Sequence, residues 1–198
     1  MADRKRVIIG ITGASGTILG LRLLELLKDV SDVETHLVMS PSATRTLLIE
    51  TDYTVEDVQD LADETYSFKD IGAAIASGSF RCEGMIVAPC SVKTLSSVAT
   101  CRSDDLIARA ADVCLKERRR LVLLFRETPL HAGHITLMDQ ATRAGAIVMP
   151  AVIGLYYQPQ SVMEIVDHLA GRALDLLGID AGTVKRWSGQ PASGACDA

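Results

Sequence analysis

The chain has 198 residues, of which 48% are hydrophobic and only 4% aromatic, and its formal net charge at pH 7 is −5. This length suits a single α/β domain with a full core of aliphatic side chains. The negative charge argues against general binding to nucleic acid or to an acidic membrane surface, but it allows a small anionic ligand held by a few local cations.

The cysteines and histidines limit the chemistry further. The five cysteines include no CxxC pair, and the four histidines show no recognised zinc spacing with them. We therefore expect reduced thiols and no metal site. No apolar stretch reaches the length of a membrane span and no signal peptide is recognised, so we predict a cytoplasmic protein.

Strand-like and helix-like segments alternate along the chain. A β-branched run at 6–11 predicts a buried strand, and the leucines after it are spaced for one face of a helix. The later elements are a strand at 34–40, a helix at 42–50, a short surface helix or loop at 55–64, a strand at 84–91, a helix after Ser91, a helix at 103–120, a strand at 121–125, a helix near 131–144, a strand at 146–150 and a helix at 161–177.

This alternation predicts one doubly wound parallel sheet, Rossmann-like or flavodoxin-like, with helices on both faces. We assign residues 1–178 to this α/β domain and residues 179–198 to a C-terminal extension. Ligands of such sheets bind beyond the carboxyl ends of the strands, so the loops that follow the strands are the candidates for function.

The first of these loops is "GITGASG" at 10–16. It is neither the GxGxxG dinucleotide fingerprint nor a P-loop, because no lysine follows its last glycine. The free amides of a helix that begins near Gly16 could hold an anion, although one helix terminus contributes only about 0.3–1 kcal/mol. Alternatively, the glycines only let the strand and the helix pack closely.

The next two loops leave similar alternatives. In "VMSPSATR", Ser40 ends a strand and Ser42 could cap the next helix, so this loop serves either for capping or for phosphate binding. Ser91 in "APCSVKTL" is a plausible N-cap. Cys90 could be a nucleophile, but no histidine lies near it in the sequence, which favours a packed thiol.

The loop "FRETPLHAGH" carries the strongest signal. Arg126 and Glu127 follow directly after a core strand, where unpaired charges would be costly to bury, so they form either a salt bridge or part of a ligand site. Arg109 and Lys116 share one helix face, which is either solvated or functional. Tyr156 stands beside a turn, and Arg172 projects from the final helix.

Taken together and in this order, these stretches resemble the UbiX-type flavin prenyltransferases, including the members described as components of phenolic-acid decarboxylases. The resemblance covers nearly the whole chain and departs mainly at 51–70 and after about residue 188. It implies an enzyme that joins a dimethylallyl group from dimethylallyl monophosphate to N5 and C6 of reduced FMN. The product, prenylated FMN, would serve a UbiD-like decarboxylase. It also implies a metal-independent reaction and a homododecamer with its sites between subunits.

The resemblance also implies roles for individual residues. Ser15 would relay a proton, Glu50 and Glu127 would act as acid or base, and Lys116 and Arg126 would stabilise the leaving phosphate. Tyr156 and Arg172, together with Lys116, would bind the prenyl phosphate, the first two acting on a neighbour's ligand. The FMN-binding residues would be Gly13, Ala14, Ser15, Ser40, Ser91, Val92, Thr94, Arg109 and Arg126.

One departure from the family concerns the prenyl site. Some members place a tryptophan shortly before "ASGS", where this chain has Ile71 and Ala73. Phe125 could supply an aromatic wall or point into the core.

Two rival functions remain at this level. One is a cysteine decarboxylase of the same superfamily, although its histidine would have to be His36, inside a predicted strand. The other is a non-catalytic flavin carrier or accessory subunit of a decarboxylase.

Overall fold

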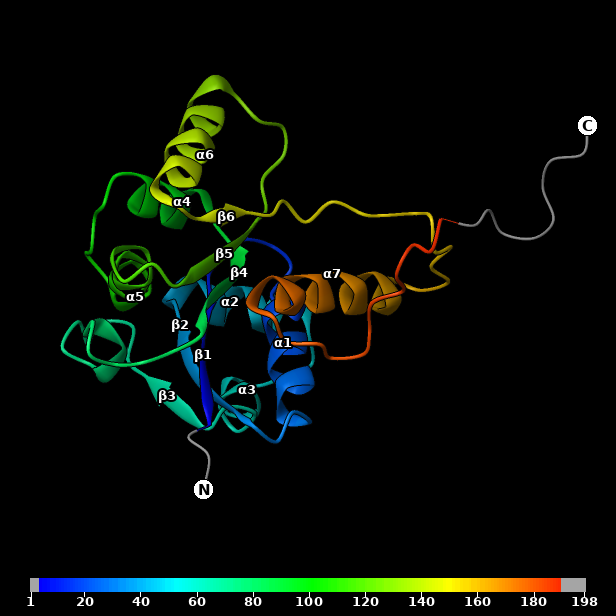
Figure 1. Cartoon of the computed structure of the whole chain (residues 1–198), viewed down its shortest axis with the longest axis horizontal. Coiled ribbons are helices and arrows are strands. Elements are labelled where there is room, and N and C mark those ends of the chain that lie inside the picture. Colours follow the sequence, from blue (N-terminus) through cyan, green and yellow to red (C-terminus); the bar gives the residue numbers. More distant parts are fainter. Residues whose placement is uncertain (1–3, 190–198) are drawn as a thin grey trace, which may run out of the picture.

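Six parallel strands form one sheet in the order β3-β2-β1-β4-β5-β6 (Figure 1). The computed structural model describes residues 4–189. The strand at 84–90 is buried at every residue and the strand at 120–125 at every residue except Arg120, as expected where helices cover both faces of a parallel sheet. The strands are β1 (Lys5–Ile11), β2 (Val33–Met39), β3 (Glu64–Tyr66), β4 (Gly84–Cys90), β5 (Arg120–Phe125) and β6 (Ile147–Val148).

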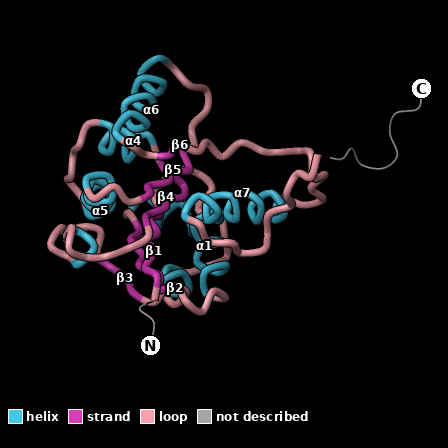
Figure 2. The backbone as a smooth tube through the Cα atoms, viewed as in Figure 1, coloured by secondary structure: helices cyan, strands magenta, loops and turns pink. Residues whose placement is uncertain are grey.

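Helices cover both faces of the sheet, so the predicted doubly wound α/β fold is confirmed (Figure 2). One core cluster joins the sheet to α1 (Ile18–Lys28), α2 (Pro41–Glu50), α3 (Val55–Gln59) and α7 (Val162–Leu177). The other joins the opposite face to α4 (Val92–Ala99), α5 (Leu106–Lys116), α6 (Ala132–Ala144) and the 3-10 turn Ala74–Ala76.

Three segments differ from the sequence-based prediction. The helix predicted at 103–120 is shorter in the structure, where α5 begins at Leu106 and ends at Lys116. Arg118 then takes a left-handed φ of 58°, and the Arg119 guanidinium donates to the carbonyl of Gly78 at 2.8 Å. The strand predicted at 146–150 shrinks to β6, and the edge strand β3 was not predicted.

A long connection leaves the body of the molecule between β6 and α7 (Figures 1 and 2). We call residues 149–160 the arm. Its side chains Val152, Ile153 and Leu155 are exposed by 72%, 52% and 70%. After α7, Gly178 caps the helix in the left-handed conformation, and Ile179 is buried in the core. The division into residues 1–178 and 179–198 stays a prediction, and residues 190–198 of that extension lie outside the described residues.

Candidate functional site

A cavity of about 360 Å³ opens where β1, β2 and β4 end. It lies at the point where the strand order reverses, with β2 on one side of β1 and β4 on the other. Ligands of doubly wound sheets bind at this point, beyond the carboxyl ends of the strands. The cavity is lined by Thr12, Gly13, Ser40, Pro41, Ser42, Phe68, Ser91, Lys93, Thr94 and Asp105.

Two helix N-termini meet at this cavity. The Ser40 hydroxyl caps α2 by accepting a hydrogen bond from the amide of Ala43 at 3.1 Å. The Ser91 hydroxyl caps α4 in the same way and contacts the Thr94 hydroxyl at 3.2 Å. Both serines therefore act as helix caps. The amides and the dipole of a helix start also favour a negatively charged ligand at these positions.

The loops after β1 and β4 are joined to each other. The buried Thr12 hydroxyl donates to the Pro89 carbonyl at 2.6 Å and accepts from the Ser91 amide at 2.9 Å. A Cβ atom on Gly13 would lie 2.2 Å from the Cβ of Ser42, so this glycine is required for close packing against α2. At Gly13, the packing explanation of "GITGASG" is therefore the one that the geometry supports.

The start of α1 is already occupied by a carboxylate of the chain itself. Glu50 accepts hydrogen bonds from the amides of Gly16 at 2.9 Å and Thr17 at 3.0 Å, and also from the Ser15 side chain. Burial raises the pKa of Glu50, but these hydrogen bonds outweigh it and hold the pKa below its ordinary value. The amides of Gly16 and Thr17 are thus paired with Glu50, which disfavours a second anion at this helix start. Glu50 is ionised and can accept a proton rather than donate one.

Arg126 and Glu127 directly follow β5 and do not pair with each other. The Arg126 amide donates to the Cys90 carbonyl at 3.1 Å, which places it next to Ser91 at the end of β4. The Glu127 carboxylate accepts from the Thr128 amide at 2.9 Å. Among residues 4–189, no ion pair joins the two, so the salt-bridge alternative is not formed. Arg126 is exposed at this edge of the sheet.

Burial decides the roles of Phe125 and Cys90, which stand at the ends of β5 and β4. Phe125 is 2% exposed and its ring centroid lies 6.4 Å from that of His134, so it belongs to the core and forms no aromatic wall. Cys90 is fully buried, and burial raises its pKa to about 12, which makes it a packed thiol.

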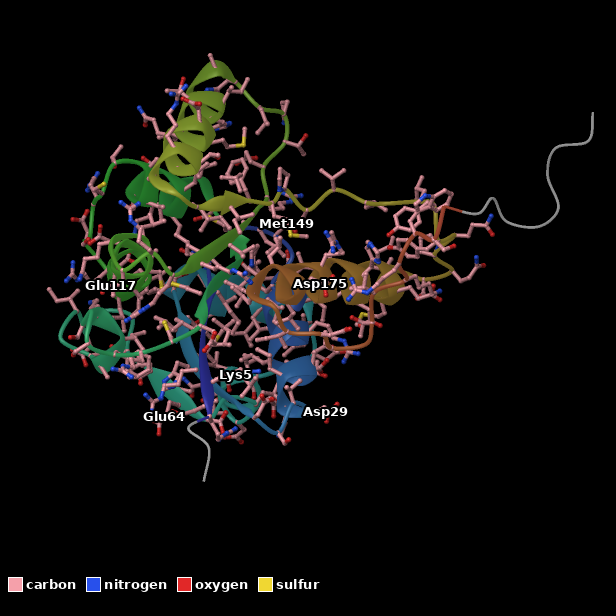
Figure 3. All side chains as sticks on the ribbon, in the orientation of Figure 1. Lys5, Asp29, Glu64, Glu117, Met149 and Asp175 are labelled. Carbon is pink, nitrogen blue, oxygen red and sulfur yellow. The ribbon has the colours of Figure 1, made fainter. Side chains whose placement is uncertain are left out.

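Ala14 and Val92 are not among the lining residues, although each directly follows one, Gly13 and Ser91 respectively. Four other expected site residues, on α5, the arm and α7, do not line the cavity of their own chain either. Lys116 is the last residue of α5. Because α5 runs antiparallel to the strands, Lys116 lies near their N-terminal ends, away from the cavity, where it pairs with Glu117. In Figure 3, Glu117 lies beside α5 and Asp175 lies on α7. Arg109 donates to the Ala76 carbonyl at 3.2 Å. The remaining two are Tyr156 in the arm and Arg172 on α7.

The predicted site lacked six residues that line the cavity: Thr12, Pro41, Ser42, Phe68, Lys93 and Asp105. The Lys93 ammonium lies 3.6 Å from the Asp105 carboxylate and 5.6 Å from the ring centroid of Phe68. Lys93 stands inside the quoted "APCSVKTL" stretch and could have been included, whereas Phe68 falls in a segment without a recognisable pattern. Within residues 4–189, no group of three or more His, Cys, Asp or Glu side chains could hold a metal ion. No helix in that range has the length and apolar character to cross a bilayer.

Comparison with known proteins agrees with this geometry. The family described as Flavoprotein matches residues 1–173. The flavin prenyltransferase UbiX of Escherichia coli (strain K12) is 52% identical over 187 residues, which cover 93% of this chain and 99% of the relative.

Two solved structures are similar over nearly their whole length. A complex of AnUbiX (PadA1) with FMN and dimethylallyl pyrophosphate has a TM-score of 0.92 and 48% identity, covering 94% of this chain and 99% of that chain. A dodecameric FMN-dependent UbiX-like decarboxylase from Escherichia coli O157:H7 has a TM-score of 0.91 and 45% identity, covering 93% and 100%. The chain belongs to the UbiX-type flavin prenyltransferases of the flavoprotein family.

Proposed function

We propose that this protein is a flavin prenyltransferase that binds reduced FMN in the cavity at the ends of β1, β2 and β4. The single observation that carries the proposal is the meeting of the α2 and α4 N-termini at a cavity at the reversal of strand order. This arrangement suits a phosphate-bearing planar ligand. The AnUbiX complex, with FMN and dimethylallyl pyrophosphate bound, supports it at 48% identity.

Each group near the cavity then has a defined task. Ser40 and the start of α2 bind the FMN phosphate, while Ser91, Val92 and Thr94 at the start of α4 contact the ring, as do Gly13 and Ala14. Reduced FMN supplies the nucleophilic N5 and C6 positions. The Ser15–Glu50 pair moves a proton, since the ionised Glu50 holds the Ser15 hydroxyl and can accept its proton. Arg126 stabilises the leaving phosphate, and Glu127 is the second acid or base.

The residues that lie away from this cavity act across subunit boundaries. Arg109 and Lys116 on α5, and Tyr156 and Arg172 near the arm, complete the cavities of neighbouring subunits in a homododecamer. The exposed apolar side chains of the arm support burial against another copy of the chain. The similar protein from Escherichia coli O157:H7 is dodecameric.

The donor and the recipient complete the proposal. We infer that the donor is dimethylallyl monophosphate, that the reaction needs no metal ion, and that prenylated FMN passes to a UbiD-like decarboxylase in the cytoplasm. The cysteine-decarboxylase alternative is disfavoured, because His36 is 2% exposed within β2 and its Nδ1 lies 2.9 Å from the Tyr66 hydroxyl.

The test is to incubate the purified protein with reduced FMN and dimethylallyl monophosphate in metal-free buffer. The molecular mass of the flavin is then measured by mass spectrometry. We expect a flavin that carries one five-carbon addition. A bound but unmodified flavin would instead identify a flavin carrier. The pyrophosphate donor, tested in parallel, decides which phosphate ester is used.

A further inference from the structure

A short segment after α7 folds back along that helix. We call residues 183–187 the C-terminal strap. The Thr183 hydroxyl donates to the Asp167 carbonyl at 3.1 Å. A Cβ atom on Gly171 would lie 2.3 Å from the Thr183 hydroxyl oxygen, so the absence of a side chain at Gly171 lets the strap lie against α7. Figure 1 shows this segment returning to the outer end of the arm.

The strap holds Tyr156, which projects from the arm. The Tyr156 hydroxyl donates to the Lys185 carbonyl at 3.0 Å and lies 3.4 Å from Nε2 of His168. The Trp187 ring packs edge-on against Tyr156 with 6.0 Å between the ring centroids. Tyr156 is 49% exposed, yet three groups fix its ring. These are the Lys185 carbonyl and the Trp187 ring from the strap and the His168 ring from α7.

The strap also holds Arg172, through a shared carboxylate. Asp175 accepts a hydrogen bond from Arg172 at 2.8 Å and two from Arg186 in the strap, each at 2.9 Å. The Asp175 side chain is only 13% exposed, and its pair with Arg186 has the bidentate geometry that fixes a guanidinium strongly. The orientation of Arg172 is thus coupled to the strap through Asp175.

We propose that the C-terminal strap positions Tyr156 and Arg172 together for the phosphate of the prenyl donor. This inference rests on the proposed function, in which these two residues bind that phosphate. Tyr156 and Arg172 come from the arm and from α7. The strap contacts Tyr156 directly and is linked to Arg172 through Asp175. Holding them before the ligand arrives reduces the ordering that binding must impose, so the strap raises affinity for the donor. Arg186 and Trp187 act as positioning residues, because neither is placed at the reacting atoms.

The kinetic test uses Arg186→Gln in the full-length protein, with Arg143→Gln as the matched control. Arg143 also pairs with an aspartate, Asp139 at 2.8 Å, but through a single contact on the exposed surface of α6. We expect Arg186→Gln to raise KM for dimethylallyl monophosphate about tenfold, with kcat and FMN affinity unchanged, because it disturbs donor binding alone. Arg186→Lys should recover part of the loss. Equal KM values for Arg186→Gln and Arg143→Gln would overturn the proposal.

A second measurement needs no turnover. Trp187 is the only tryptophan of the chain, so its fluorescence reports on the strap. Titration of the flavin-free protein with dimethylallyl monophosphate should change this fluorescence, and Arg186→Gln should shift the titration to higher concentration. Absence of any change in the unmodified protein, or an unshifted variant, refutes the strap's role. Failure of the proposed function would show separately in the mass-spectrometric test. There the flavin would gain no mass, even though dimethylallyl monophosphate changes the Trp187 fluorescence.

Discussion

The Glu50 carboxylate accepts a hydrogen bond from the Thr17 hydroxyl at 2.9 Å, which places a negative charge of the chain itself at the start of α1. A second anion is therefore unfavourable at this helix start. The starts of α2 and α4, capped by Ser40 and Ser91, are left as the positive ends that face the cavity. The same contact network gives Glu50 a pKa below its ordinary value and orients Ser15.

Replacing Glu50 by Gln should destabilise the protein in a pH-dependent way. The folded pKa of Glu50 lies below its ordinary value of 4.5, so the stabilisation is complete above that pH and disappears as the pH falls through the lowered value. We expect Glu50→Gln to lower the free energy of unfolding by about 1 kcal/mol at pH 7, a low figure for a charged hydrogen bond because Glu50 is exposed. Denaturant unfolding of both proteins across this pH range measures it. A difference that is the same at every pH contradicts the assignment.

Ser40 should affect both stability and FMN binding, and Ser161 offers a control. Both serines cap helices, since Ser40 accepts from Ala43 and Ser161 accepts from Glu164 at 3.2 Å. Each Ser→Ala change should cost about 1 kcal/mol of stability. Only Ser40→Ala should also weaken FMN binding, by about tenfold for one lost phosphate contact. Denaturant unfolding and flavin fluorescence titration separate the two effects, and equal FMN affinities in the two variants would argue against phosphate binding at Ser40.

Lys116 and Ser15 should complement each other between subunits. Lys116 ends α5 and does not line the cavity of its own chain, so we expect it to serve a neighbour's cavity. Lys116→Ala and Ser15→Ala should each abolish most prenyl transfer, whereas Lys116→Ala should leave FMN binding intact. Oligomers assembled from a mixture of the two variants should recover about a quarter of the activity, because that share of sites combines two intact residues. No recovery after mixing would place both residues in one subunit's site.

The arm should be needed for assembly. Leu155 is 70% exposed in a single chain, and burying such a side chain contributes about 1.5–3 kcal/mol. Leu155→Asp should therefore shift the protein to smaller species in analytical ultracentrifugation. Gln160→Asp, which adds the same charge at an exposed polar position of the arm, should sediment like the unmodified protein. If Leu155→Asp assembles normally, the arm is not an interface.

Two cysteines should differ strongly in reactivity. A hydrogen bond from the Cys114 thiol, assisted by the Arg119 guanidinium 3.8 Å away, holds the pKa of Cys82 below its ordinary value. Burial raises the pKa of Cys90 to about 12. Iodoacetate at pH 7.5 should therefore modify Cys82 well before Cys90, as followed by peptide mass spectrometry. Similar rates at the two positions would contradict these pKa directions.

Local patterns were sufficient for much of the fold. Apolar runs predicted β1, β4 and β5, and leucine spacing predicted α1, because both patterns follow from burial of one face or of both faces. The capping role of Ser91 also followed from local chemistry, whereas the expected cap Ser42 lies inside α2 and Ser40 caps that helix instead. The end of α5 could not be predicted, because Arg119 leaves the helix to bond a carbonyl 41 positions away, at Gly78.

The sequence by itself determined the fold class, the family resemblance and the loops in which a ligand site had to lie. Only the tertiary structure decided that Glu50 occupies the start of α1 and that Lys93 and Phe68 line the cavity. It also decided that Lys116 lies near the N-terminal ends of the strands, away from that cavity. Helix and strand patterns depend on neighbours a few residues apart, which the order of residues specifies directly. The distance between side chains on different elements depends on the direction and packing of those elements, and spacing along the chain does not contain it.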